Sequence, residues 1–286
     1  MIYFCADDYG LNETSSVRIK QCIDEGILNK VSVFPNFGPF DLEKIRNCKR
    51  ISLHLNLVEG KCMADAEKID LIADKDGKLK HTFGGLFKLN LFRRKELEAQ
   101  VYEEIKAQVL FWKNILPKDV PFCIDSHQHT HMIPAVFKAL IKVLNDEKIT
   151  PEYVRIPAEP VLPYIKTPSL YFTYSPVNLI KQWLLKSLWL VNKSLAKKNQ
   201  IQTSYFMGIL FSGKMDEKRV SKILPKYIRP AEKKGRDIEV LFHPGYLDES
   251  EIDVTDSNVV FREFYLSVNR KTEFDSVIKL SERRVS

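Results

Sequence analysis

The chain has few cysteines, and their arrangement excludes two common ways of cross-linking a fold. The five cysteines are odd in number and form no C-x-x-C pair, so the sequence predicts reduced thiols and no disulfide or zinc framework. The beginning, MIYFCADDYG, has no basic region ahead of its short apolar run, unlike a signal peptide. We therefore expect a cytoplasmic protein.

Linkers and repeats are also missing. No Gly-, Ser- or Pro-rich stretch and no repeat period divides the 286 residues, which argues against solenoids and favours a single domain over residues 1–286. Apolar residues make up 44% and charged residues 28%, as in soluble globular proteins. The net charge is +7, but the lysines are scattered and no nucleic-acid-binding motif accompanies them. We expect a solvated basic surface and no nucleic-acid partner.

Short apolar runs alternate with longer amphipathic ones, which is the order expected of β-α units around a parallel sheet. We expect strands at 2–6, 31–34, 51–57, 120–124, 153–156 and 238–242. Helices are expected at 13–25, 96–112, 135–144 and 177–198, with others on both sides of the last strand. The sequence thus predicts an α/β fold with parallel strands.

Chemically capable side chains stand at the carboxyl ends of these strands. Asp7 and Asp8 follow the first, His54 lies within the third, His127 follows the fourth and His243 follows the last. In a β/α barrel the carboxyl ends of all strands open on one mouth. Residues far apart in the sequence would therefore meet there, and packing alone does not explain the pattern.

Three of the six histidines lie in one run, Asp125-Ser-His-Gln-His-Thr-His131. Imidazole and carboxylate are ligands for divalent ions such as zinc. In an extended chain residues 127, 129 and 131 face one side, whereas in a helix His127 and His131 become i, i+4 neighbours. Both geometries offer two ligands. The alternative, strongest for His129, is a helix cap or a backbone hydrogen bond.

Two adjacent carboxylates at the end of a buried strand are costly unless they are paired. Because successive strand residues point to opposite sides, one of Asp7 and Asp8 can bind a cation while the other holds a water or a histidine. A helix cap is the alternative for one of them. His54 could be a satisfied core residue, but its place at the predicted mouth favours a site. The turn at Pro244-Gly245 would present His243 at the rim, where it suits a general acid.

Other side chains are assigned to the pocket less specifically. We expect Asn36, Arg155 and Glu159 to line it, and Tyr9 and Tyr246 to contact a substrate, although each aromatic ring could equally be core packing.

The expected helix at 177–198 carries tryptophans and interior lysines, which argue against a membrane span. An outer barrel helix is the first interpretation, and an interfacial helix touching a lipid-linked substrate is the second.

Five motifs occur in order along the chain: ADDYG at 6–10, LHLNL at 53–57, DSHQHTHMIP at 125–134, RIP at 155–157 and HPG at 243–245. Each is weak alone, but the ordered set resembles the YdjC-like carbohydrate deacetylases over almost the whole chain. The resemblance implies a distorted TIM-like (β/α) barrel, with a helical insertion at about 160–200. It also implies one divalent metal ion, Mg²⁺ or Zn²⁺, and hydrolysis of the acetamido group of an N-acetylated amino sugar.

Carried over by motif position, the resemblance implies that Asp8, His54 and His127 are metal ligands, that Asp7 is the general base and that His243 is an assisting acid. His131 matches a histidine whose role is not fixed and is an additional metal or site candidate. The substrate can be an oligosaccharide or a glycolipid. The expected partners are that substrate, a peripheral membrane or glycolipid contact, and a second copy of the chain in a homodimer.

Two rival functions stay open at this point. Clustered His and Asp residues at a barrel mouth also serve metal-dependent phosphoesterases, usually with two or more metals. A non-catalytic sugar- or glycolipid-binding protein on the same fold would lack a ligand or the base, and neither is missing from this sequence.

Overall fold

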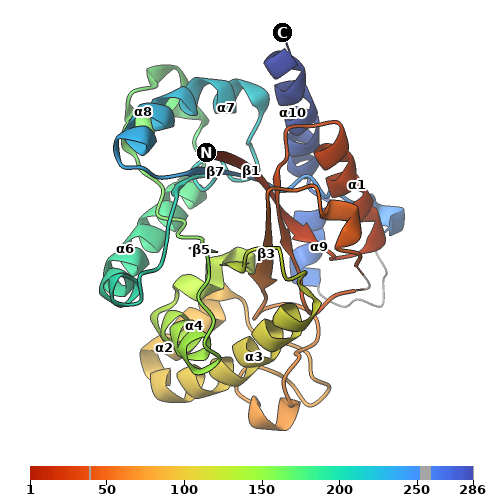
Figure 1. The fold of residues 1–286 in the computed structure, drawn as a ribbon, viewed down its shortest axis with the longest axis vertical. Coiled ribbons are helices and arrows are strands. Elements are labelled where there is room, and N and C mark those ends of the chain that lie inside the picture. The colour runs from red at the N-terminus through yellow and green to blue at the C-terminus, as the bar shows by residue number, and fades with distance from the viewer. Residues whose placement is uncertain (39, 252–258, 286) are drawn as a thin grey trace.

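A single parallel sheet organises the fold (Figure 1). The computed structural model describes residues 1–38, 40–251 and 259–285. The seven strands are β1 (Ile2–Tyr9), β2 (Lys30–Val33), β3 (Arg50–Leu55), β4 (Cys123–Ser126), β5 (Tyr153–Val154), β6 (Tyr205–Met207) and β7 (Ile238–Phe242). They lie in the order β5-β4-β3-β2-β1-β7-β6, and every neighbouring pair is parallel. The predicted parallel α/β sheet is confirmed.

The sheet curls until its two edges approach each other. The backbone N–H of Val154, on edge strand β5, donates to the carbonyl of Gln202 at 3.3 Å. The hydroxyl of Tyr153 lies 3.0 Å from that of Ser204, immediately before the other edge strand, β6. Within the described residues seven strands form this curl, and the result is the distorted TIM-like barrel that the motifs implied.

The helices lie outside the sheet. They are α1 (Glu13–Asp24), α2 (Phe83–Phe92), α3 (Arg94–Ile115), α4 (Pro134–Asp146), α5 (Leu162–Ile165), α6 (Pro176–Lys198), α7 (Glu217–Ile223), α8 (Pro225–Lys233), α9 (Val259–Tyr265) and α10 (Val268–Val285). They gather in three groups around the strands: α2 to α4, α6 to α8, and α1 with α9 and α10 (Figure 1). Residues 160–200 contain α5, a 3-10 turn at Pro168–Thr173 and α6. Among the described residues, no helix is both long and apolar enough to cross a membrane.

The elements differ from expectation mainly where local signals are weak. The sequence does not predict β6, which has only three residues, or α2, whose sequence FGGLFKLNLF contains two glycines that disfavour a helix. β1 is longer than expected and includes Asp7 and Asp8. The strands read as near-continuous apolar runs because both faces of a covered parallel sheet are buried.

Four charged side chains with no exposed surface lie within the curl of the sheet: Lys30, Asp125, Arg155 and Glu239. Lys30 Nζ lies 2.7 Å from Glu239 and 3.1 Å from Asp125, and Arg155 Nε donates to Glu239 at 2.7 Å. Buried charges persist only when they are paired and hydrogen-bonded. We call these four residues the interior ion network.

Candidate active site

A bulge near the end of β1 turns two adjacent aspartates toward the same histidine. The register between β1 and β2 shifts between Ala6 and Tyr9, and Asp8 has a left-handed φ of 72°, which Asp tolerates better than most residues. Regular alternation would send Asp7 and Asp8 to opposite faces. Instead, carboxylate oxygens of Asp8 and Asp7 lie 3.5 and 3.8 Å from His54 Nε2.

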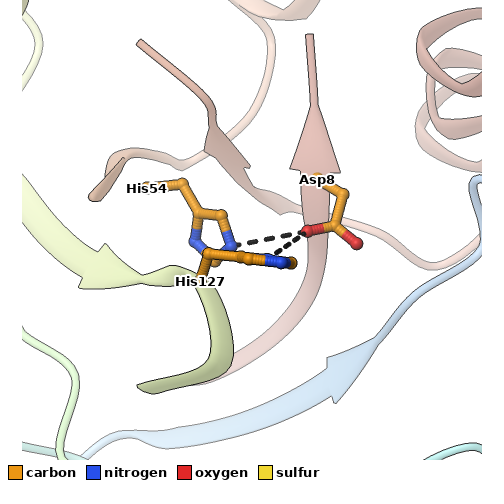
Figure 2. Close-up of side chains that lie close together, drawn as sticks. All are labelled: Asp8, His54 and His127. Atoms are coloured by element: carbon orange, nitrogen blue, oxygen red, sulfur yellow. Dashed lines mark hydrogen bonds and ion pairs between the residues drawn. The ribbon is translucent and has the colours of Figure 1, made fainter. Parts of the chain in front are cut away.

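The second histidine comes from the turn that follows β4. His127 begins the 3-10 segment His127–Met132, in which Gln128 and His129 both have positive φ, an uncommon backbone that often marks a functional site. His127 Nδ1 lies 3.2 Å from Asp8 Oδ1, and its Nε2 lies 3.4 Å from Glu59 Oε2. Figure 2 shows both imidazoles converging on one carboxylate oxygen of Asp8.

These three side chains fit a small divalent cation. Metal–ligand distances of about 2.0–2.2 Å place adjacent ligand atoms about 3.0–3.5 Å apart, and Asp8 Oδ1 lies 3.5 and 3.2 Å from the two imidazole nitrogens. The His54 Nε2 atom is buried without a hydrogen-bond partner among the described residues. Asp8, His54 and His127 each offer one potential ligand atom, and these atoms all lie within 4.8 Å of one another. This triad is therefore a candidate metal centre.

The orientation of His54 is fixed from its other ring nitrogen. Its Nδ1 lies 2.7 Å from Asp125 Oδ1, and the hydroxyl of Ser32 donates to the second oxygen of Asp125 at 2.7 Å. A carboxylate behind a histidine is the usual support of a metal ligand. Burial alone lowers the pKa of His54, but Asp7, Asp125 and Asp8 outweigh burial and raise this pKa to about 9. The site therefore attracts positive charge, either a proton or a cation.

Asp7 differs from Asp8 in being held by a bidentate ion pair. Arg155 donates to its two oxygens at 2.7 and 2.8 Å. Burial raises the pKa of the Asp7 carboxyl, but Arg155 and His54 outweigh it and keep this pKa below its usual value. Asp7 is therefore ionised at neutral pH and fixed in direction.

A second group of potential ligands, Asp7, His54 and Asp125, also lies within bonding range of a cation. Its carboxylates already pair with Arg155, and Asp125 also pairs with Lys30. Positive charge is thus already present there. Arg270 pairs with Asp8 through Oδ2, so Asp8 Oδ1, between His54 and His127, is the better place for one further cation.

His243 directly follows β7, the strand that pairs with β1. Phe242 pairs with Ala6 in the β1–β7 register, so the residues that follow them continue two adjacent strands at the same level. The backbone N–H of His243 donates to Glu273 at 2.6 Å, and its Nδ1 lies 3.5 Å from the same carboxylate. Its side chain is 16% exposed, compared with 1% for His54, which suits a group that exchanges protons at the rim.

Three of the less specific pocket candidates bind protein groups. Arg155 is fully buried behind Asp7. Glu159 is also fully buried and accepts hydrogen bonds from the backbone N–H groups of Gly208 and Leu210. Asn36 donates to the carbonyls of Glu59 and Lys61. Direct contact of these three with a substrate stays a prediction, and their observed contacts position neighbouring groups.

The two tyrosines also have structural contacts. Tyr9 is buried, and its hydroxyl donates to the carbonyl of Asp41; burial raises the pKa of its phenol to about 12. Tyr246 lies beneath the guanidinium of Arg18, 3.7 Å from its ring centroid. A stacking role on a sugar stays a prediction for both.

The two remaining histidines of the run are placed differently. His131 Nδ1 contacts the hydroxyl of Ser126, and its Nε2 lies 2.7 Å from the carbonyl of Arg155, so the structure does not bring either nitrogen to the triad. The ring of His129 packs edge-on against Phe206 with centroids 5.8 Å apart. Burial holds the pKa of both imidazoles below its usual value.

Sequence reasoning did not assign several groups that support the site. Glu59 contacts His127, and Asp125 orients His54. Both acidic residues lie in or beside the five motifs, so the sequence could have indicated a role for them in the site. Arg270 of α10 donates to Asp8 Oδ2 and to the carbonyl of Gly245. Glu273 of α10 holds His243. Nothing in the pattern of α10 marks these two residues.

One supporting residue belongs to α6. Lys181 is half-buried, and burial lowers the pKa of its ammonium group, against the carboxylate of Asp7, which raises it. The side-chain amide of Asn192, also on α6, donates to the carbonyl of Met132 in the turn that carries His127. This helix therefore borders the site.

Comparison with known proteins settles the family. A family model described as YdjC-like protein matches residues 1–283. The chain belongs to the YdjC-like family. The resemblance found in the ordered motifs is therefore confirmed.

Two curated relatives are both named carbohydrate deacetylase. The one from Danio rerio is 32% identical over 160 residues, which are 54% of this chain and 49% of the relative. The one from Clostridium beijerinckii is 22% identical over 190 residues, which are 64% of this chain and 72% of the relative. The match thus spans about half the length of the Danio rerio protein.

The fold is similar to a solved structure. The crystal structure of an Enterococcus faecalis V583 protein, provisionally described as a cellobiose-phosphate cleavage protein, superposes with a TM-score of 0.66 at 16% identity. The superposition covers 98% of this chain and 92% of the other. At this identity the likeness concerns the fold alone.

Proposed function

We propose that the protein is a metal-dependent carbohydrate deacetylase that hydrolyses the acetamido group of an N-acetylated amino sugar, in an oligosaccharide or a glycolipid. The observation that carries the proposal is one oxygen of Asp8 lying 3.2 and 3.5 Å from two buried imidazole nitrogens, beside the fixed carboxylate of Asp7. The family and the names of the two relatives support the reaction class.

The reaction needs an activated water and a stabilised oxyanion, because an amide carbonyl is a poor electrophile. A divalent ion, Mg²⁺ or Zn²⁺, held by Asp8, His54 and His127 would supply both by acidifying water and polarising the carbonyl. Asp7 is ionised and directed by Arg155, so it can take the proton of the attacking water. His243, at the rim of the adjacent strand, donates a proton to the departing amine.

The structure favours this reaction over the rival phosphoesterase, which usually needs two or more metals. The second potential ligand group already has Lys30 and Arg155 as its cations. One metal per chain is therefore expected. A non-catalytic sugar-binding protein would not require the arrangement of Asp7 beside the triad and of His243 on the next strand.

Acetate release tests the proposal. The protein loaded with Mg²⁺ or Zn²⁺ is incubated with a panel of N-acetylated oligosaccharides and glycolipids, with a chelated sample and a generic phosphate ester in parallel. Acetate release that chelation abolishes is the expected result. Phosphate release without acetate would replace the proposal with the phosphoesterase. Sugar binding with neither product would leave only a binding protein.

A further inference from the structure

Positive charge is concentrated in one segment of the chain. Residues 160–215 contain seven lysines and no acidic residue, whereas the whole chain has 44 basic and 37 acidic side chains. The remainder of the chain is therefore balanced at 37 of each. The entire net charge of +7 belongs to this segment, which contains α5 and α6.

The same segment exposes large apolar side chains. Phe172 is fully exposed in the turn before α6, and Trp183 is 69% exposed in the middle of that helix. We define the α6 outer face as the exposed apolar residues Phe172, Val177, Ile180, Trp183, Leu190 and Val191. Aromatic and aliphatic side chains are normally covered when they cluster in this way, so the face needs an occupant.

The outer face is a fixed surface of the helix. Its members at 177, 180, 183, 190 and 191 recur at helical spacing, and the opposite side buries Leu185 and Leu188. Gln182 donates to the carbonyl of Glu159, and Asn192 donates to the carbonyl of Met132. These bonds hold the inner side against the barrel, so the apolar outer side cannot turn inward.

Lysines border this face. Lys186 and Lys193 are exposed on α6 and form no ion pair with the described residues. The helices α6 and α8 lie on the same side of the molecule (Figure 1), and a cavity of about 570 Å³ lies between α5 and α8. Its lining includes the exposed Leu162 of α5, five Lys or Arg side chains and no acidic residue. The cavity thus combines an apolar wall with groups that bind phosphate.

We infer that the α6 outer face, together with the basic cavity between α5 and α8, docks on a bilayer surface rich in anionic lipid. Exposed Trp and aliphatic side chains beside lysines, with no spanning helix in the described part of the chain, are the properties of an interfacial helix. Each lysine near an anionic surface adds attraction. A second copy of the chain is a poor occupant, because its segment carries the same seven positive charges. The inference does not depend on the deacetylase proposal, because vesicle binding is measured without substrate.

Vesicle co-sedimentation of the full chain tests the inference. We expect binding to vesicles of phosphatidylcholine with phosphatidylglycerol, weak binding to phosphatidylcholine alone, and a blue shift of tryptophan fluorescence that Trp183→Phe removes. Ile180→Ser with Trp183→Ser should weaken binding by about tenfold or more. The matched control is Leu91→Ser with Phe92→Ser on α2, two side chains that are also exposed, and it should bind normally.

Charge is tested in the same way. Lys186→Glu with Lys193→Glu should also weaken binding by about tenfold or more, whereas the same charge change at Lys95 and Lys113 of α3, both exposed, should have a smaller effect. Absence of vesicle binding, or equal losses in the α6 variants and their controls, would overturn the inference. So would light scattering that shows a dimer of the native chain dissociated by the α6 variants, because the face would then bind a second copy.

Discussion

Two clusters of buried charge lie next to each other in this barrel, and they are completed in different ways. In the interior ion network, Lys30 and Arg155 pair with Asp125, Glu239 and the neighbouring Asp7. At the mouth, Asp8 faces the nitrogens of His54 and His127. The interior carboxylates pair with the protein's own cations. At the mouth Arg270 pairs with Asp8 Oδ2 only, which leaves Asp8 Oδ1 facing the two imidazoles, where an added cation fits. The interior charges support the fold, whereas the charges at the mouth are arranged to bind a metal ion.

His54 joins the two clusters, because its Nδ1 contacts Asp125 of the interior and its Nε2 faces Asp8. The interior network therefore orients a metal ligand as well as stabilising the barrel. Variants on either side of this histidine should affect different properties: activity or metal binding at the mouth, and folding stability in the interior.

The largest effect is expected from Asp7→Asn. Removing the proton acceptor should lower the turnover number by about 10²–10⁴-fold, because the side-chain amide of the new asparagine cannot accept the proton of the attacking water. Metal binding should persist, since Asp8, His54 and His127 are unchanged. Turnover is measured by acetate release and metal content by elemental analysis of the same preparation. Near-normal turnover would show that another group is the base.

Lys30→Met tests the interior half of the comparison. Removing one partner leaves buried carboxylate charge without its cation, so the free energy of unfolding should fall by about 3–5 kcal/mol. Denaturant titration measures this loss. Metal stoichiometry of the remaining folded protein should not change. A stability close to that of the native chain would contradict the account of Lys30 as an essential partner of Asp125 and Glu239.

Asp125→Asn acts on the junction between the two clusters. Loss of the carboxylate behind His54 should weaken metal affinity by about 10–100-fold, with a smaller effect on the number of bound ions at saturation. Calorimetric titration gives both quantities. Glu43→Gln, at an exposed carboxylate paired with Arg46, is the control and should leave affinity unchanged. Equal affinities in both variants would exclude an orienting role for Asp125.

The pH dependence of metal binding gives the smallest and most specific effect. Without metal, the surrounding carboxylates raise the pKa of His54 to about 9 against the effect of burial. Below this pH a proton must leave His54 before the metal binds, so the apparent affinity should fall about tenfold for each pH unit below that value. Above it the affinity should level off. In Asp125→Asn the apparent metal affinity should level off at a lower pH. A metal affinity of the native chain that does not change with pH would contradict competition between the proton and the metal.

Much of the fold could be predicted because its signals are local. The β7 strand lies at the residues that its apolar run predicts, and the helices α1, α3, α4 and α6 lie within a few residues of expectation. Short β6 and glycine-containing α2 carry little local signal. The curl that brings Tyr153 next to Ser204 is set by packing of the whole sheet, and it was inferred from the ordered motifs and not from periodicity.

The site was predictable to the extent that its residues end strands. Asp8, His54 and His127 could be proposed from the motifs, and the structure brings them together; their roles stay predictions. Regular strand alternation gives no reason for Asp7 and Asp8 to face one histidine, because the β1 bulge is not visible in the sequence. Arg270 reaches Asp8 from α10, and such a contact across the whole length of the chain has no local signal.

The role of the triad can be decided by metal stoichiometry under saturating Mg²⁺ or Zn²⁺, measured side by side for the native chain and His127→Ala. We expect one bound ion per native chain and loss of that ion in the variant, with the fold retained by circular dichroism. Two ions per native chain, none, or equal metal content in both proteins would contradict it.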